Sequence, residues 1–298
     1  MSRPLKLILV AAAVFCFAAC VKPPDPYVAE IELFRSERLK ELLADDGWLT
    51  LAGLYWLKPG ANRMGTDSAA EIILSAGSAP AALGSITLDD KGGLLFEAIP
   101  GVIVTRDGQI VTRTLLDSDD GRAPTMLKAG RLTFYVIKRQ GRYALRLKDN
   151  DSLVRRQFHG IDSFPIDLRF RVEARFEPYD PPRTLAFQTA IGGSDAAISP
   201  GRVAFDLEGQ NLSLEATREP GEDALSFVFG DLTNSNETYG GGRFLDASLA
   251  DGGKVILDFN KAYNPPCVFT PYATCPLPTH ENKLPVRIEA GERSSAMH

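Results

Sequence analysis

Polar side chains precede a stiff loop near the C-terminal end of the chain, in the stretch LDFNKAYNPPC. Asp258 and Asn260 are two residues apart, so a strand would place both side chains on one face. A carboxylate and an amide on one face, followed by Tyr263 and Asn264, suit the wall of a pocket that binds a small polar or anionic ligand. The alternative is a series of turns, in which Asn260 and Asn264 bond to nearby backbone groups.

The glycines at positions 240–242, in ETYGGGRFL, mark a second candidate. Without side chains they let the backbone come close to a ligand, and Arg243 offers a fork for a carboxylate or a phosphate, with Tyr239 beside it. If their segments are neighbouring strands, we expect Arg243 to pair with Asp258, because a buried carboxylate needs a partner. The alternative is a glycine-rich hairpin turn in which Tyr239 is a packed ring.

Basic side chains gather in a third stretch, RLKDNDSLVRRQFHG. One interpretation is an anion-binding lip, for which Arg155 is the expected contact. The other is a solvated hairpin with surface ion pairs, each of which contributes less than about 1 kcal/mol. The basic residues are Arg146, Lys148, Arg155, Arg156 and His159.

Catalytic templates match this sequence poorly. His159, His280 and His298 are not spaced as zinc ligands, and no G-x-S-x-G motif is present. The sequence therefore predicts neither a metal site nor a cofactor. An acid/base pair built on Asp258 or Glu237 would suit a hydrolase, although 38 acidic residues make such pairs easy to find. A hydrolase that acts on an envelope or imported substrate is thus one alternative to a ligand-binding protein, and an interaction protein without a pocket is another.

Residues 1–19 have the pattern of a secretory signal. Arg3 and Lys6 precede an apolar run of about a dozen residues, too short for an ordinary membrane-spanning helix. The run ends in FAAC, which resembles a bacterial lipobox, and the resemblance implies that Cys20 is lipidated and becomes the first mature residue. Val21 then favours the outer membrane, facing the periplasm, as the location. The alternatives are an ordinary signal peptide or a retained N-terminal anchor.

The charge of the mature chain restricts its partners. Removal of residues 1–19 takes away Arg3 and Lys6, so the net charge changes from 33 − 38 = −5 to 31 − 38 = −7. Nucleic acid is not an expected partner, because phosphate binding needs clustered cations. Residues 20–26 form a proline-rich tether, and we expect the membrane contact to be made by the lipid on Cys20 alone.

Two cysteines, Cys267 and Cys275, remain in the mature chain. The periplasm is oxidising, so we expect them to form a disulfide. That bond would contribute roughly 2–3 kcal/mol on the chain-entropy model. With the prolines of the same loop, it would brace the polar residues that precede it.

Helical periodicity is clear only in residues 27–46, where one side carries apolar residues and the other is charged. Beyond it the pattern has period two, interrupted by Gly-rich and Asp-rich turns. Gln140-Gly141 predicts a hairpin, and PVRIEA (285–290) is the last expected strand.

These patterns predict an all-β fold. We expect two sandwich-like subdomains, over residues 47–160 and 161–293, preceded by one N-terminal amphipathic helix.

The stretch GLYWLKPGANRMGTDSAAEIIL has the strand and turn order that opens a forkhead-associated (FHA) sandwich, and the resemblance covers roughly residues 48–120. It implies a fold only. Thr66 stands where that family has an arginine after Gly65, and Asp107-Gly108 replaces its Asn-Gly. Phosphopeptide binding is therefore not expected.

A second resemblance spans nearly the whole mature chain. The segments DDGWLTLAGLYWL, RYALRLKDNDSLVRRQFHGIDSFPID, ETYGGGRFL and LDFNKAYNPPCVFTPYATCPLP resemble the bacterial family called domain of unknown function 1684. The resemblance implies a shared fold and no activity, because that family has none assigned. Arg155 lies in the segment that resembles the family pattern most closely.

Overall fold

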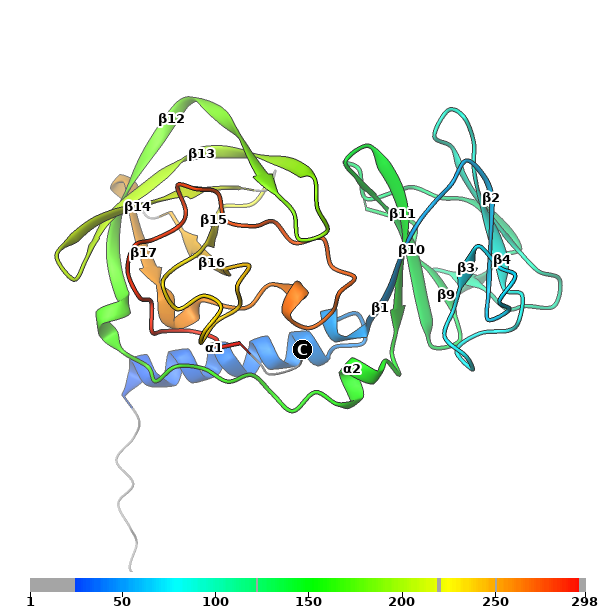
Figure 1. Ribbon diagram of the computed structural model, residues 1–298, viewed down its shortest axis with the longest axis horizontal. Helices are drawn as coiled ribbons and strands as arrows, with labels where there is room; N and C mark the ends of the chain where they lie inside the picture. Colours follow the sequence, from blue (N-terminus) through cyan, green and yellow to red (C-terminus); the bar gives the residue numbers. More distant parts are fainter. Residues whose placement is uncertain (1–24, 122, 219–220, 250, 295–298) are drawn as a thin grey trace, which may run out of the picture.

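Strands make up most of the regular structure, and the prediction of an all-β fold with an N-terminal helix is confirmed (Figure 1). The computed structural model of the chain describes residues 25–121, 123–218, 221–249 and 251–294. The predicted signal peptide and Cys20 lie outside these described residues. The strands form an N-terminal sandwich, β1 to β11, and a C-terminal half, which is β12 to β17 with the chain that follows them.

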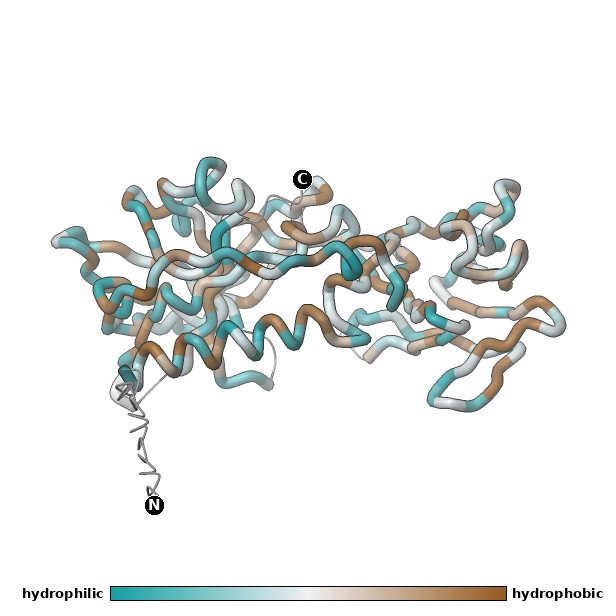
Figure 2. The backbone as a smooth tube through the Cα atoms, turned by 90° about the horizontal axis from the view of Figure 1, so that it is seen from below, coloured by the Kyte–Doolittle hydropathy of each residue, from teal (hydrophilic) through white to brown (hydrophobic). Residues whose placement is uncertain are grey.

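Helix α1 (Pro26–Leu43) begins with a capping residue and a proline. The Asp25 Oδ1 accepts a hydrogen bond from the Tyr27 N–H at 2.8 Å, and Pro26 has no N–H that would need a partner. Ile31 and Leu42 are buried on the face that packs against the rest of the protein. Figure 2 shows that α1 runs along the C-terminal half toward the sandwich.

Helix α1 ends three residues earlier than predicted, at Leu43 rather than at residue 46. Ala44 already has an extended backbone, with φ −59° and ψ 157°. The turn that follows brings Gly47 so close to the carbonyl oxygen of Glu41 that a Cβ there would lie 2.4 Å from it. A close backbone approach therefore ends the helix.

The N-terminal sandwich packs two sheets face to face. Their strand orders are β1-β11-β10-β9-β6-β7 and β3-β2-β4-β5-β8. Phe96 and Phe134 meet in the core, with ring centroids 5.6 Å apart. The strands are β1 (Leu51–Trp56), β2 (Gly60–Gly65), β3 (Ile72–Ile73), β4 (Gly84–Leu88), β5 (Leu94–Ala98), β6 (Thr105–Arg106), β7 (Gln109–Ile110), β8 (Arg113–Leu115), β9 (Leu127–Ala129), β10 (Leu132–Arg139) and β11 (Arg142–Asp149).

Alternate side chains of strand β11 point away from the sandwich core and toward the C-terminal half. It pairs with β10 through a turn at Gln140 and Gly141, whose φ values of 52° and 73° belong to the predicted hairpin. Leu145 and Leu147 lie in the sandwich core, so Arg146 between them points to the opposite face. That face is covered, because Arg146 is only 5% exposed.

The C-terminal half contains a sheet of order β14-β13-β12-β17 and the pair β15-β16. Phe259 lies at its centre, with ring centroids 5.9 Å from Phe205 and 5.4 Å from Phe229. The strands are β12 (Arg171–Gln188), β13 (Ser194–Leu207), β14 (Gln210–Ala216), β15 (Ala224–Phe229), β16 (Arg243–Ser248) and β17 (Lys254–Asp258). Short helical segments are α2 (Leu153–Arg156), η1 (Trp48–Thr50), η2 (Leu168–Phe170), η3 (Asp251–Gly253), η4 (Phe259–Lys261) and η5 (Pro266–Val268).

Two strand predictions near the C-terminal end are wrong. β17 ends at Asp258 and η4 follows at once, so Asp258 and Asn260 do not share one face of a strand. Residues 285–290 are not a strand, although Val286, Ile288 and Ala290 are buried with the expected period of two.

The irregular loop of residues 264–278, called the cysteine loop below, fills the junction between the sandwich and the C-terminal half. On one side, the Thr270 hydroxyl donates to the Leu51 carbonyl at 3.1 Å. On the other, the Cys275 carbonyl accepts from the Ala190 N–H at 2.9 Å. The loop therefore holds the two halves together.

Candidate functional site

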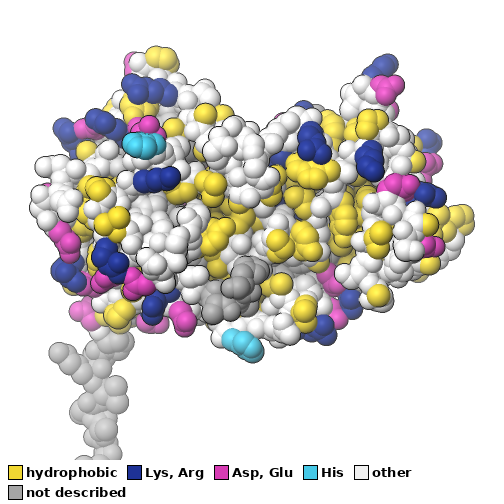
Figure 3. Space-filling model, in the orientation of Figure 1, with side chains coloured by type: hydrophobic (Ala, Val, Ile, Leu, Met, Phe, Trp, Pro, Cys, Tyr) yellow, Lys and Arg dark blue, Asp and Glu magenta, His cyan; other side chains and the backbone are white. Residues whose placement is uncertain are grey.

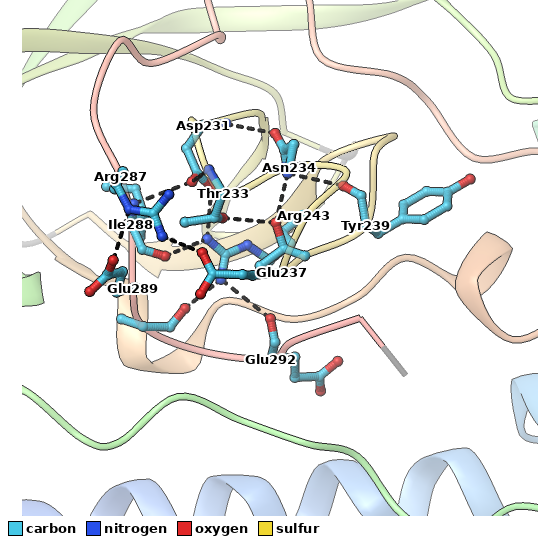
Figure 4. Close-up of polar contacts among 12 residues, drawn as sticks. Asp231, Thr233, Asn234, Glu237, Tyr239, Arg243, Arg287, Ile288, Glu289 and Glu292 are labelled. Carbon is cyan, nitrogen blue, oxygen red and sulfur yellow. Dashed lines mark hydrogen bonds and ion pairs between the residues drawn. The ribbon is translucent and has the colours of Figure 1, made fainter. Parts of the chain in front are cut away.

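Arg243, one of the candidate residues predicted from the sequence, is a buried structural clamp (Figure 4). Its side chain is fully buried at the start of β16 and pairs with Asp231 at 2.8 Å. It also donates to the carbonyls of Ile288, at 2.8 Å, of Glu292, at 3.3 Å, and of Ala290. These bonds explain the missing strand at 285–290, because Arg243 takes the place of a neighbouring strand for alternate carbonyls.

The predicted pairing of Arg243 with Asp258 is wrong. β16 pairs with β15, whereas Asp258 ends β17, which pairs with β12. Asp231 instead faces Arg243, and its other carboxylate oxygen accepts the Ile288 N–H at 3.2 Å. Burial lowers the pKa of Arg243, while Asp231 opposes this effect. The pair is closed, because both side chains are 0% exposed.

The glycines of residues 240–242 serve packing. A Cβ at Gly241 would lie 2.4 Å from the Tyr239 ring, and Gly242 has φ +85°. The Tyr239 ring points away from the Arg243 clamp (Figure 4) and packs against the apolar cluster that contains Phe269. Glu237 pairs with Arg287.

Asp258 and Asn260 hold the N-terminal end of α1. The Tyr27 hydroxyl donates to both carboxylate oxygens of Asp258, at 2.9 and 3.0 Å, and accepts from the Asn260 side-chain amide at 2.9 Å. Burial and the neighbouring Asp258 raise the pKa of Tyr27 far above its ordinary value. Arg171 lies 3.8 Å from Asp258. This cluster is best explained as an attachment point for the helix.

Tyr263 and Asn264 hold the middle of α1. The Arg38 guanidinium lies over the Tyr263 ring, 4.7 Å from its centroid, and donates to the Asn264 carbonyl at 3.0 Å. Arg38 also lies 3.4 Å from the buried carboxylate of Glu292. The Tyr263 hydroxyl donates to Asp246 at 2.7 Å.

Arg155 holds the C-terminal end of the same helix. It donates to the Leu43 carbonyl at 2.7 and 3.2 Å, to the Asn150 carbonyl at 2.9 Å and to the Asp45 carboxylate at 2.9 Å. A cation at this end satisfies free carbonyls and complements the helix dipole. Arg155, Asp258, Asn260, Tyr263 and Asn264 are thus brought together along α1, and not around one pocket.

Cys267 and Cys275 are free thiols in the described chain, so the predicted disulfide is absent from it. They are nevertheless neighbours, since the Cys267 N–H donates to the Cys275 Sγ at 3.2 Å. A hydrogen bond between the two thiol side chains holds the pKa of Cys267 below its ordinary value, and this side-chain bond together with burial raises the pKa of Cys275.

A cavity of about 360 Å³ lies beside these thiols, where the sandwich and the C-terminal half meet; it is called the junction cavity below. Figure 3 shows hydrophobic side chains gathered over the junction. Arg139 and Arg146 come from the sandwich, Trp48 comes from η1 just before β1, and the C-terminal half contributes mainly apolar residues with a few polar ones. The residues of the C-terminal half include Phe187, Asp195, Phe244, Thr274 and Cys275.

Arg146 is the unusual group in the junction cavity. It is 95% buried, yet no carboxylate among the described residues forms an ion pair with it, and its Nε lacks any hydrogen-bond partner there. Its Nη2 has a long contact of 3.4 Å with the Thr274 hydroxyl. The Trp48 ring centroid, 5.5 Å away, offers some electrostatic compensation. A buried cation in this state can accept an anion.

Besides Arg146, the cavity has one ion-paired cation and one further carboxylate on its wall. Arg139 is paired with Asp119 at 2.8 Å, and Asp195 contributes one carboxylate to the wall. The arginine without an ion pair is therefore the group on which a ligand would depend. Within the part of the chain that the structure describes, no three metal-ligating side chains cluster as a metal site.

The sequence placed Arg146 in the basic stretch but favoured Arg155 as the anion contact. A stronger signal was available in β11, where Arg142, Arg146 and Lys148 share the face opposite Leu145. The alternation of side chains along this strand could have identified Arg146 as a cation on the face opposite the sandwich core. The missing carboxylate partner could not have been recognised.

Comparisons with known proteins give a family but no activity. The family described as "Protein of unknown function (DUF1684)" matches residues 156–293. The solution NMR structure of an uncharacterized protein of Haloarcula marismortui is 32% identical over 48% of this chain and 81% of that one, with a TM-score of 0.41. No curated protein matches the chain. The FHA resemblance stays a prediction.

Among the described helices, none is both long and apolar enough to span a membrane.

Proposed function

We propose that this chain, which belongs to the DUF1684 family through residues 156–293, is a lipid-anchored cell-envelope protein that binds a small anionic ligand in the junction cavity. The observation that carries the proposal is Arg146, a buried guanidinium without an ion-pair partner among the described residues. The ligand is still a small anion, as the sequence predicted, but the proposed site is the junction cavity and not a pocket of the C-terminal half.

The energetic argument depends on burial. A charge removed from water is costly unless it is paired, and the effective penalty in proteins is several kcal/mol per ion. An anion that binds Arg146 would supply the missing partner of this buried guanidinium. The Thr274 hydroxyl, 3.4 Å from Nη2, could bond the same anion. The cavity volume of about 360 Å³ lies within the usual range for small-molecule sites.

Thermal unfolding of the full-length protein in detergent tests this proposal. Acetate, sulfate and phosphate are added separately at constant ionic strength. An anion at about 100 times its Kd adds about 2.7 kcal/mol, which corresponds to a rise in Tm of roughly 5–10 °C. Arg146→Gln should abolish the rise. The matched control is Arg142→Gln, on the same face of β11 but exposed. Equal responses of both variants, or no response to any anion, would reject the proposal.

The lipid anchor and the envelope location are supported by the sequence FAAC, with Cys20 as the acyl acceptor. Mass spectrometry of the protein from bacterial membranes should find diacylated Cys20 at the mature N-terminus. Cys20→Ser should block this processing. Wild-type protein whose N-terminus is unmodified, or lies elsewhere, would contradict the anchor.

The proximity of Cys267 and Cys275 supports disulfide formation in an oxidising envelope, although both are free thiols in the structure. Intact mass after purification without reductant should be lower by two hydrogens than after reduction.

A hydrolase has less support, because Asp258 binds Tyr27 and Glu237 binds Arg287.

A further inference from the structure

We infer that the ligand of the junction cavity is a monocarboxylate with a flat apolar body, such as an aromatic acid. This inference rests on the proposed function and goes beyond it, since it assigns the head group, the charge and the body of the ligand. Three independent features of the cavity lead to it: the free edge of Arg146, the balance of charges and the aromatic walls.

The free edge of Arg146 selects a planar head group. A carboxylate binds a guanidinium side-on through two parallel hydrogen bonds, from Nε–H and from one Nη–H of the same edge. Here Nε has no hydrogen-bond partner among the described residues, and Nη2 has only the long 3.4 Å contact with Thr274. Neither donor of a side-on fork thus has a close partner among the described residues, and a carboxylate bound along this edge would satisfy both.

The balance of charges selects a single negative charge. Arg139 is neutralised by Asp119, which leaves the charge of Arg146 and that of Asp195 on the cavity wall. A monoanion would pair with Arg146 and leave only the Asp195 carboxylate without a counter-charge on the cavity wall. A phosphate dianion would bring a second negative charge close to the Asp195 carboxylate on the same wall, and like charges repel. A carboxylate is therefore favoured over a phosphate monoester.

The aromatic walls select the body of the ligand. Trp48 from η1, Phe187 from β12 and Phe244 from β16 line the cavity. Phe244 is held by an edge contact with the Tyr263 ring, with centroids 5.8 Å apart. Such rings bind other flat rings by offset or edge contacts, beyond the gain from buried area. A volume of about 360 Å³ is near the lower end for ligand sites, so the body is small.

The two tryptophans of the chain provide a direct readout. Trp48 lines the cavity, whereas Trp56 stacks on exposed Arg142, with 4.3 Å between the guanidinium carbon and the ring centroid. Trp56→Phe leaves Trp48 as the fluorophore. Titration of this full-length variant with benzoate, acetate, phenyl phosphate and benzamide then reports on the cavity. Benzamide has the shape of benzoate but no charge.

The inference predicts that benzoate changes Trp48 fluorescence and binds at least about tenfold more tightly than acetate, phenyl phosphate or benzamide. Arg146→Lys, which keeps the charge but loses the fork, should weaken benzoate binding by about tenfold or more. Arg142→Lys is the matched control and should leave the affinity within about twofold of the parent value. Trp48→Leu, followed by calorimetry, should weaken benzoate and leave acetate unchanged.

Different failures have different meanings. If acetate binds as tightly as benzoate and both need Arg146, the aromatic body is wrong and the proposed function stands. Tighter Arg146-dependent binding of phenyl phosphate would overturn the monocarboxylate assignment alone. If benzamide equals benzoate, or if no anion binds with dependence on Arg146, both the inference and the proposed function fail. Circular dichroism of each variant shows whether it has folded.

Discussion

Replacement of Arg243 by methionine should be among the most destabilising single changes in this protein. The variant loses the ion pair with Asp231 and the hydrogen bonds to the carbonyls of Ile288, Ala290 and Glu292. It leaves the Asp231 carboxylate, whose side chain is 0% exposed, without its cation. Removal of one partner of a buried ion pair costs about 3–5 kcal/mol.

Equilibrium unfolding in urea, followed by far-UV circular dichroism, measures this loss. With an m value of about 3 kcal/mol/M, the midpoint should fall by about 1–2 M. The double variant Asp231→Asn/Arg243→Met should be more stable than Arg243→Met, because it removes the unpaired charge. The difference in stability between the double and the single variant measures the cost of the unpaired Asp231 charge, separately from the loss of the hydrogen bonds to the carbonyls.

Arg287→Met is the matched control, because Arg287 forms an ion pair with Glu237 nearby but its side chain is 46% exposed. We expect a cost below about 1 kcal/mol for this variant. A loss for Arg243→Met that is no larger than for Arg287→Met would refute the conclusion that Arg243 is a structural clamp. A double variant no more stable than Arg243→Met would refute the electrostatic part.

Other predictions concern helix attachment, pH and thiol reactivity. Tyr27→Phe should lower the free energy of unfolding by about 1–3 kcal/mol, because the buried Asp258 carboxylate loses a hydrogen-bond donor. A calorimetric Tm equal to that of wild type would contradict this prediction. Burial raises the pKa of Glu292, so the unfolded chain releases this proton first as the pH rises above 4.5. The stability of wild type relative to Glu292→Gln should therefore fall through the folded-state pKa, and parallel urea curves at pH 4 and pH 7 would exclude this. In reduced protein, iodoacetamide should modify Cys267 before Cys275, which is 6% exposed and has the higher pKa; peptide mapping that finds the reverse order would contradict it.

Local patterns were sufficient for much of the fold. The Gln140-Gly141 turn, the burial of Leu145 and Leu147 in β11, and the N-terminal helix α1 were all predicted from neighbouring residues. These features depend on periodicity and turn chemistry, which act over a few residues.

The local rules failed at the C-terminal end. Residues 285–290 have the alternation of a strand, and Ile288 is buried as expected. The backbone partner is nevertheless Arg243, a side chain 45 residues earlier in the sequence. Alternation indicates which residues are buried but not which group satisfies their carbonyls, because that choice depends on what the fold brings close.

The sequence by itself determined the residue types available for a site, an all-β architecture and the N-terminal helix, and it predicts a signal in residues 1–19. Only the tertiary structure decided what each polar residue does. Asp258 binds Tyr27, 231 residues away, and becomes part of a helix attachment. Arg146 is buried without an ion pair in the described chain and becomes the candidate ligand contact. The physical reason is that a charge acquires its role from burial and from its partner, and both are set by long-range packing.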